Sequence, residues 1–187
     1  MPHERGPRLS LAEWLVLCLV SEGTRHSFAI AGLLAPDGSL GRVWHVQKGV
    51  VYRAVQRLER LGLITVSEKE PSTLGPDRAQ LQATPEGRQA AARWLRQPAG
   101  HSRDIRSELL VKLALLDRAG GDPRDLLQAQ RGQLAPIADA LAGQARTTTG
   151  YDHVLALWRH ESISATLRFL DTLLAAVPVQ RTAGGRQ

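Results

Sequence analysis

Residues 47–62 read QKGVVYRAVQRLERLG, and this stretch decides the fold because its apolar and cationic residues separate when it is wound as a helix. At about 100° per residue, Val51, Val55 and Leu58 fall on one stripe. The opposite side carries Arg53, Gln56, Arg57 and Arg60, with Lys48 and Tyr52 at its margin. We therefore expect a helix that docks through its valines and leucine and presents a cationic face.

The same part of the chain holds most of its positive charge. Residues 42–60 carry five basic side chains and one acid, a net of +4, while the whole chain has a formal net charge of +6. Arginine can bind guanine and glutamine can bind adenine with two hydrogen bonds each, and both can bind phosphate. The cationic face is thus typical of a DNA-recognition helix, with a merely solvated basic surface as the plainer alternative.

Composition is that of a globular, mostly helical protein. The 187 residues are 43% hydrophobic and 22% charged, which is enough to bury a core. The sequence pI of about 10.4 suggests a polyanionic partner. The single cysteine, Cys18, lies in the apolar run LVLCLV, where a buried inert thiol is expected, and the absence of an intrachain disulfide fits a cytoplasmic location.

Helix signals precede the basic stretch. Ser10 and Glu13 have the spacing of a capping box, which predicts a helix from Leu11 to about residues 21–23. A second, shorter helix is expected over residues 27–35, before a Pro-Asp-Gly turn. The basic helix should end at Gly62, because glycine is common just after a helix. Three helices in this order indicate a helix-turn-helix unit.

A hairpin should follow the basic helix. Residues 63–68 contain enough β-branched residues to form a strand, and residues 78–83 can form a second strand antiparallel to it. Thr84 and Pro85 then have the types expected at the N-cap and first position of a fourth helix, which would end before Pro98. A hairpin after a basic helix is a wing, so residues 1–97 are expected to form a winged helix-turn-helix domain.

The second half is predicted to be entirely helical. The proline and glycine in residues 97–102 mark a boundary, and helices are expected over residues 104–119, 122–146 and 151–177. The last helix has an apolar stripe too broad to face solvent, which favours a homodimer built by residues 98–178 over a monomeric bundle. Residues 179–187 are expected to be a disordered tail. The predicted fold class is mostly α, with an α+β winged helix.

The order of these motifs resembles the PadR-like family of transcriptional regulators. Residues 49–64, GVVYRAVQRLERLGLI, are similar to the family's recognition helix, which begins Gly-Thr-aliphatic-Tyr and ends Leu-Glu-x-x-Gly-Leu. Residues 26–30 stand where the family has His-Gly-Tyr, and residues 83–88 resemble the start of its fourth helix. Residues 108–113 and the long helices look like its C-terminal dimerisation region. Val50 replaces the usual threonine, and Ser27-Phe28 replaces Gly-Tyr.

The resemblance implies a dimeric winged-helix repressor that binds double-stranded DNA at a pseudo-palindromic operator and is released by a small molecule. The residues that would enter the major groove are Tyr52, Arg53, Gln56 and Arg57. The residues that would hold phosphates are Lys48 and Arg60, and the wing residues Lys69 and Arg78 would approach the backbone or minor groove. The alternative is a helical interaction module whose basic face binds an acidic protein.

Other kinds of site receive weaker support. Trp94, Tyr151 and Trp158 are candidates for a pocket that binds a small aromatic effector, with core packing as the alternative. His153 and His160 share a helical face, but no further ligand completes a spacing, so we expect no metal and no cofactor. We find no nucleotide-binding loop or nucleophile elbow and expect no enzyme. The apolar run near the N-terminus is interrupted by Glu13, so neither a leader nor a membrane span is expected.

Overall fold

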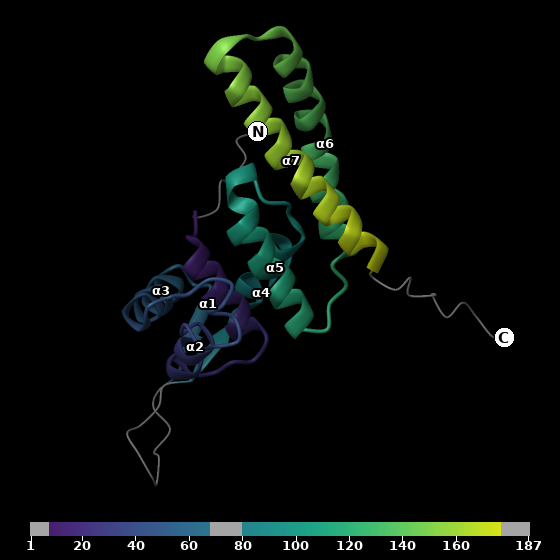
Figure 1. Ribbon diagram of the computed structural model, residues 1–187. Coiled ribbons are helices and arrows are strands. Elements are labelled where there is room, and N and C mark those ends of the chain that lie inside the picture. Colours follow the sequence, from purple (N-terminus) through teal and green to yellow (C-terminus); the bar gives the residue numbers. More distant parts are fainter. Residues whose placement is uncertain (1–7, 68–79, 177–187) are drawn as a thin grey trace, which may run out of the picture. The chain divides into compact units, whose positions relative to one another are not determined.

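The computed structural model describes residues 8–67 and 80–176. Its first elements are α1 (Leu11–Ser21), α2 (Ser27–Leu33), α3 (Lys48–Arg60), β1 (Ile64–Val66), β2 (Leu81–Ala83) and α4 (Pro85–Arg96) (Figure 1). Then come a 3-10 turn (Ser102–Asp104), a π-helical turn (Ile105–Leu109), α5 (Leu110–Arg118), α6 (Arg124–Thr147) and α7 (Gly150–Ala176). This order confirms the predicted fold class, a mostly helical chain with a winged helix-turn-helix.

The chain packs as two compact units. The first comprises Met1–Arg96 and Arg103–Gly121, and the second comprises Gln97–Ser102 and Asp122–Gln187. Helix α5 therefore groups with the N-terminal helices, because Val111 and Leu115 are buried in their hydrophobic core. These packing units differ from the boundary drawn after residue 97, and the division into a DNA-binding and a dimerisation domain stays a prediction.

Helix α1 is the centre of the first unit. All residues from Leu15 to Val20 are buried, as expected for a core helix that is apolar on more than one side. The predicted capping box is confirmed: the Ser10 backbone N–H donates to Glu13 Oε2 at 2.7 Å, and the Glu13 N–H donates to Ser10 Oγ at 3.4 Å. Helices α3 and α4 both pack against α1. Burial of Cys18 raises the pKa of its thiol far above the usual range, which leaves it inert as expected.

The hairpin and the start of α4 follow the sequence signals. β1 and β2 are antiparallel, with Ile64 opposite Ala83 and Val66 opposite Leu81. Gly62 has a φ of +68°, which suits the glycine expected after α3. The Thr84 hydroxyl donates to the Gly62 carbonyl at 2.8 Å and accepts from the Gly87 N–H at 3.0 Å, so Thr84 caps α4 and ties it to the end of α3.

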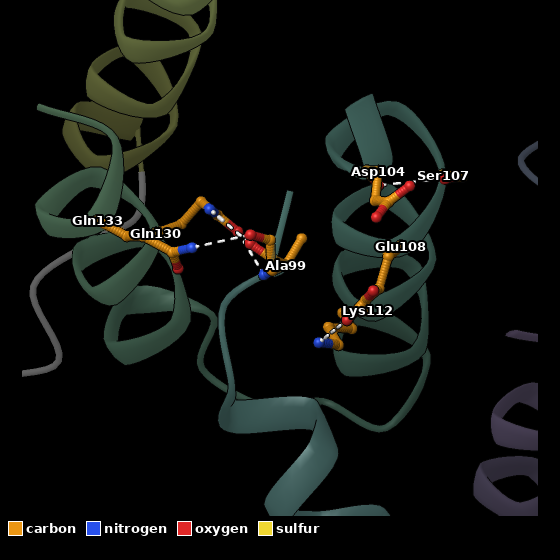
Figure 2. Close-up of polar contacts among 8 residues, drawn as sticks. Ala99, Asp104, Ser107, Glu108, Lys112, Gln130 and Gln133 are labelled. Atoms are coloured by element: carbon orange, nitrogen blue, oxygen red, sulfur yellow. Dashed lines mark hydrogen bonds and ion pairs between the residues drawn. The ribbon is translucent and has the colours of Figure 1, made fainter. Parts of the chain in front are cut away.

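The segment before α5 departs from the sequence prediction of one regular helix over residues 104–119. Ile105–Leu109 forms a π-helical turn, which holds more residues per turn and rotates the positions that follow it around the axis. Lys112, three residues after this turn, is fully buried, with its ammonium 2.5 Å from Glu108 and 4.5 Å from the centre of the Trp94 ring. Figure 2 shows the Lys112–Glu108 pair one turn apart.

The second unit is a hairpin of two long helices, α6 and α7, that run antiparallel (Figure 1). Its other component is the short segment 97–102, held by Gln130 of α6. The buried Gln130 side chain accepts from the Ala99 N–H at 2.7 Å and donates to the Ala99 carbonyl at 3.4 Å, and Gln133 donates to Gly100 (Figure 2). An exposed ion pair, Arg131 to Asp171 at 2.6 Å, crosses from α6 to α7.

Two further sequence predictions concern a membrane-spanning helix and the C-terminal tail. None of the helices within residues 8–67 and 80–176 combines the length and apolar character needed to span a bilayer. The predicted tail, residues 179–187, lies outside the described residues.

Candidate nucleic-acid interface

Helix α3 has one buried and one exposed side, as its sequence predicts. Val51, Ala54, Val55 and Leu58 are buried, and the helix packs against α1, α2 and β1. All six α3 residues proposed to contact DNA are exposed, namely Lys48, Tyr52, Arg53, Gln56, Arg57 and Arg60. Exposure is what a DNA contact requires, and the contact itself stays a prediction.

The Arg57 guanidinium has hydrogen-bond partners within its own unit. It donates to Glu13 Oε1 at 3.1 Å and to the Arg8 carbonyl at 3.3 Å. The Glu13 side chain is only 9% exposed and also closes the capping box of α1, whereas the Arg57 side chain is 46% exposed. The pair thus fixes the direction in which Arg57 leaves α3.

A shallow hollow of about 410 Å³ lies between the start of α1 and α3. Its polar lining comes from Ser10, Glu13, Arg53, Gln56, Arg57 and Arg60. Three arginines therefore border one concave surface, a charge distribution that suits a phosphate group or a base edge.

An aromatic group lies beside the first turn of α3. The Lys48 ammonium is 5.4 Å from the centre of the Phe28 ring and 5.9 Å from that of Tyr52, within the range of cation–π attraction. Phe28 is 70% exposed and Tyr52 is 40% exposed. The sequence predicts a DNA contact for Lys48 and Tyr52 but no contact with Phe28, which stands 20 residues before Lys48 on another helix.

The wing residues Lys69 and Arg78 lie outside the described residues, so their approach to DNA stays a prediction. The base of the hairpin is described: Ile64, Leu81 and Ala83 are buried, and the intervening Thr65 and Gln82 are exposed.

The three residues proposed for an effector pocket lie in two different units. Trp94 is buried in the first unit, stacked on Trp14 with ring centres 5.2 Å apart and planes 7° apart. Burial lowers the pKa of Lys112, which lies over Trp94, and hydrogen bonding to Glu108 opposes this shift. Tyr151 and Trp158, 78% and 69% exposed, belong to α7 of the second unit. Their role in effector binding stays a prediction.

Metal binding finds no geometric support within residues 8–67 and 80–176, where no three His, Cys, Asp or Glu side chains cluster. His153 and His160 each have a backbone partner on α6: His153 Nδ1 lies 2.7 Å from the Ala145 carbonyl, and His160 Nδ1 lies 3.1 Å from that of Ala138. These two histidines therefore help to pair α6 with α7.

Part of the chain matches a known protein family. Residues 16–93 match the model of the family described as "Transcriptional regulator PadR-like family". This range begins within α1 and ends within α4, so it includes α3 and the hairpin. No curated protein matches the chain.

Several solved structures resemble the chain, including the following two. PadR of Bacillus subtilis, crystallised with operator DNA, is 17% identical with a TM-score of 0.46, and the similarity covers 90% of this chain and 100% of that one. The smu.1604c protein of Streptococcus mutans UA159 is 16% identical with a TM-score of 0.41, covering 87% of this chain and 98% of that one.

Proposed function

We propose that the chain is a PadR-like transcriptional regulator, as the family match over residues 16–93 supports, and that it acts as a dimeric repressor that binds a pseudo-palindromic operator. The same proposal places it in the cytoplasm, with access to DNA. The observation that carries the proposal is the exposed side of α3, where every polar side chain from Lys48 to Arg60 except Glu59 can donate hydrogen bonds to an anion or a base edge.

The chemistry of α3 divides its residues between two tasks. Arg53 and Gln56, one turn apart, have the side chains best suited to the two hydrogen bonds that guanine and adenine offer in the major groove. Lys48 and Arg60 stand at the two ends of the helix, where phosphates pass. Arg57, with its guanidinium oriented by Glu13, and Tyr52 would contact the groove between these ends.

A homodimer would give the operator its symmetry. Helix α7 keeps Tyr151, Val154 and Trp158 exposed on one side of the single chain, and this apolar side is what a second copy would cover. In a two-fold dimer the two α3 helices would contact half-sites about 34 Å apart, one turn of DNA.

Release by a small molecule is the last part of the proposal. Tyr151 and Trp158, exposed in the single chain, would line a pocket at the dimer interface in which a flat aromatic ligand can stack. Titration with planar cationic dyes, followed by tryptophan fluorescence, tests it: quenching in the wild type and its loss in Trp158→Phe support an effector site at α7, and an unchanged emission spectrum removes it.

Operator binding is tested by enriching the full-length chain on a random library of duplex DNA and measuring affinity for the selected sequence at several salt concentrations. We expect an inverted repeat and an affinity that falls steeply with salt, because bound cations release counterions from DNA. The double variant Arg53→Ala/Gln56→Ala should no longer bind the selected sequence. Arg146 is an exposed arginine at the end of α6, and the control variant Arg146→Ala should bind that sequence as tightly as the wild type. Failure to enrich any sequence would favour an acidic protein as the partner of the basic face.

A further inference from the structure

Phe28 is the most exposed large apolar residue within the described part of the first unit. It is the second residue of α2, whose inward side is already occupied by the buried Ile30 and Ala31. Phe28 is 70% exposed, so its ring gains little from burial inside the unit. This apolar ring, in solvent on the cationic side of the domain, is therefore accessible to a partner outside the unit.

The position of Phe28 is tied to α3 through one cation. The Lys48 ammonium lies near both the Phe28 and the Tyr52 rings, at 5.4 and 5.9 Å. We call Phe28, Lys48 and Tyr52 the aromatic–lysine cluster. It joins the start of α2 to the start of α3, the end of a recognition helix that contacts base edges.

The chemistry of this cluster suits one feature of duplex DNA. The thymine C5-methyl is the apolar group that bases present in the major groove, and phenylalanine is among the side chains that contact it. A lysine between the rings supplies a positive charge for the neighbouring phosphate. A ring 70% exposed beside that charge can cover a methyl group without losing contacts inside its own unit.

We propose that Phe28 is a specificity-determining residue that contacts a thymine methyl in each operator half-site, with Lys48 bound to the adjacent phosphate. The proposal rests on the proposed function, since it needs an operator. It goes beyond that function because it assigns a base-specific contact to a residue of α2. It also gives the half-site a required thymine beyond the bases read by Arg53 and Gln56.

The test removes the methyl group and nothing else. Each thymine of the enriched sequence is replaced in turn by deoxyuridine, and affinities are measured for the wild type and for Phe28→Ala. We expect one symmetry-related thymine whose replacement weakens the wild type about fourfold per half-site, the effect of one buried methyl group. Phe28→Ala should bind the thymine and deoxyuridine versions of that site equally.

Matched controls separate this result from a general loss of binding. Deoxyuridine at the other thymines should affect both proteins alike, and Phe28→Leu, which keeps an apolar side chain, should retain part of the methyl preference. Phe28→Ala should keep the wild-type Tm because little of the ring is buried.

Equal deoxyuridine penalties in the wild type and in Phe28→Ala would overturn the proposal and assign the cluster to a different partner, as would a half-site in which no thymine responds. These outcomes differ from failure of the proposed function, in which the library yields no enriched sequence at all.

Discussion

Helices α3 and α7 both expose one long side, but the two exposed sides differ in kind. On α3 the apolar residues Val51, Val55 and Leu58 are all buried, and what remains outside is mostly cationic. On α7 the buried residues are Ala156, Ile163 and Leu170, while Val154 and Trp158 stay exposed. The first helix has its apolar partners within its unit, and the second has more apolar surface than α6 covers.

The difference follows from the number of neighbours. Helix α3 is surrounded on its apolar side by α1, α2 and β1, whereas α7 packs mainly on one helix, α6. A two-helix hairpin can bury only one stripe of each helix. The exposed side of α3 thus suits a polar, charged partner, and the exposed side of α7 suits an apolar partner. Substitutions on one helix can therefore weaken one interaction without affecting the other.

The largest effect is expected where α3 is seated in its unit. Leu58→Ala removes a fully buried side chain and should lower the free energy of unfolding by about 3 kcal/mol, measured by urea denaturation. The matched change on α7, Leu157→Ala, removes a half-exposed side chain and should cost much less at low protein concentration. Similar losses at both positions would show that α7 is as well covered as α3.

The next effect is on self-association. Trp158→Ala removes the largest exposed apolar side chain of α7 and should raise the Kd of the dimer about 30-fold, as expected for an interface hot spot. Sedimentation equilibrium measures this directly. Arg159→Ala, the exposed neighbouring residue that projects in a different direction from the helix, should leave the Kd nearly unchanged. A wild-type chain that is monomeric at all concentrations would contradict the prediction.

DNA binding should be affected by the outer residues of α3 in two distinguishable ways. Arg53→Ala should cost about 1–3 kcal/mol of binding free energy on the selected operator and relax the preference at one base. Lys48→Ala should weaken all sequences alike and reduce the slope of log affinity against log salt by about one. Equal loss on every sequence for Arg53→Ala would make Arg53 a phosphate contact instead.

Features encoded within one helical turn were predictable from the sequence. The capping box of Ser10 and Glu13, the glycine after α3 and the Thr84 cap all depend on residues a few positions apart, and all are confirmed. The two sides of α3 likewise follow from periodicity. The DNA contacts themselves stay a prediction, because exposure is consistent with a contact and does not establish it.

Features that join distant residues were not predictable. Glu13 was recognised as a cap, but its contact with Arg57, 44 residues later, depends on how α1 and α3 pack. The approach of Lys48 to Phe28 depends in the same way on α2. The burial of Lys112 over the Trp94 ring, 18 residues earlier on another helix, depends on how α5 packs against α4. Patterns of residue type report local geometry, whereas these contacts are set by tertiary packing.

The smallest effect is expected at Arg57, the α3 arginine that pairs with Glu13 of its own unit. A double-mutant cycle of Glu13→Gln and Arg57→Ala should give a coupling of about 0.2–1 kcal/mol in unfolding free energy, the range for a pair whose arginine is largely in water. Glutamine can keep the capping box, so Glu13→Gln removes the charge without removing the cap. In DNA binding, Glu13→Gln should alter sequence preference at the base that Arg57→Ala also alters, and nowhere else, because Glu13 acts by orienting Arg57. A coupling of zero, or a change of preference that persists when Arg57 is already alanine, would mean that Arg57 is as free as Arg53 and that Glu13 serves α1 alone.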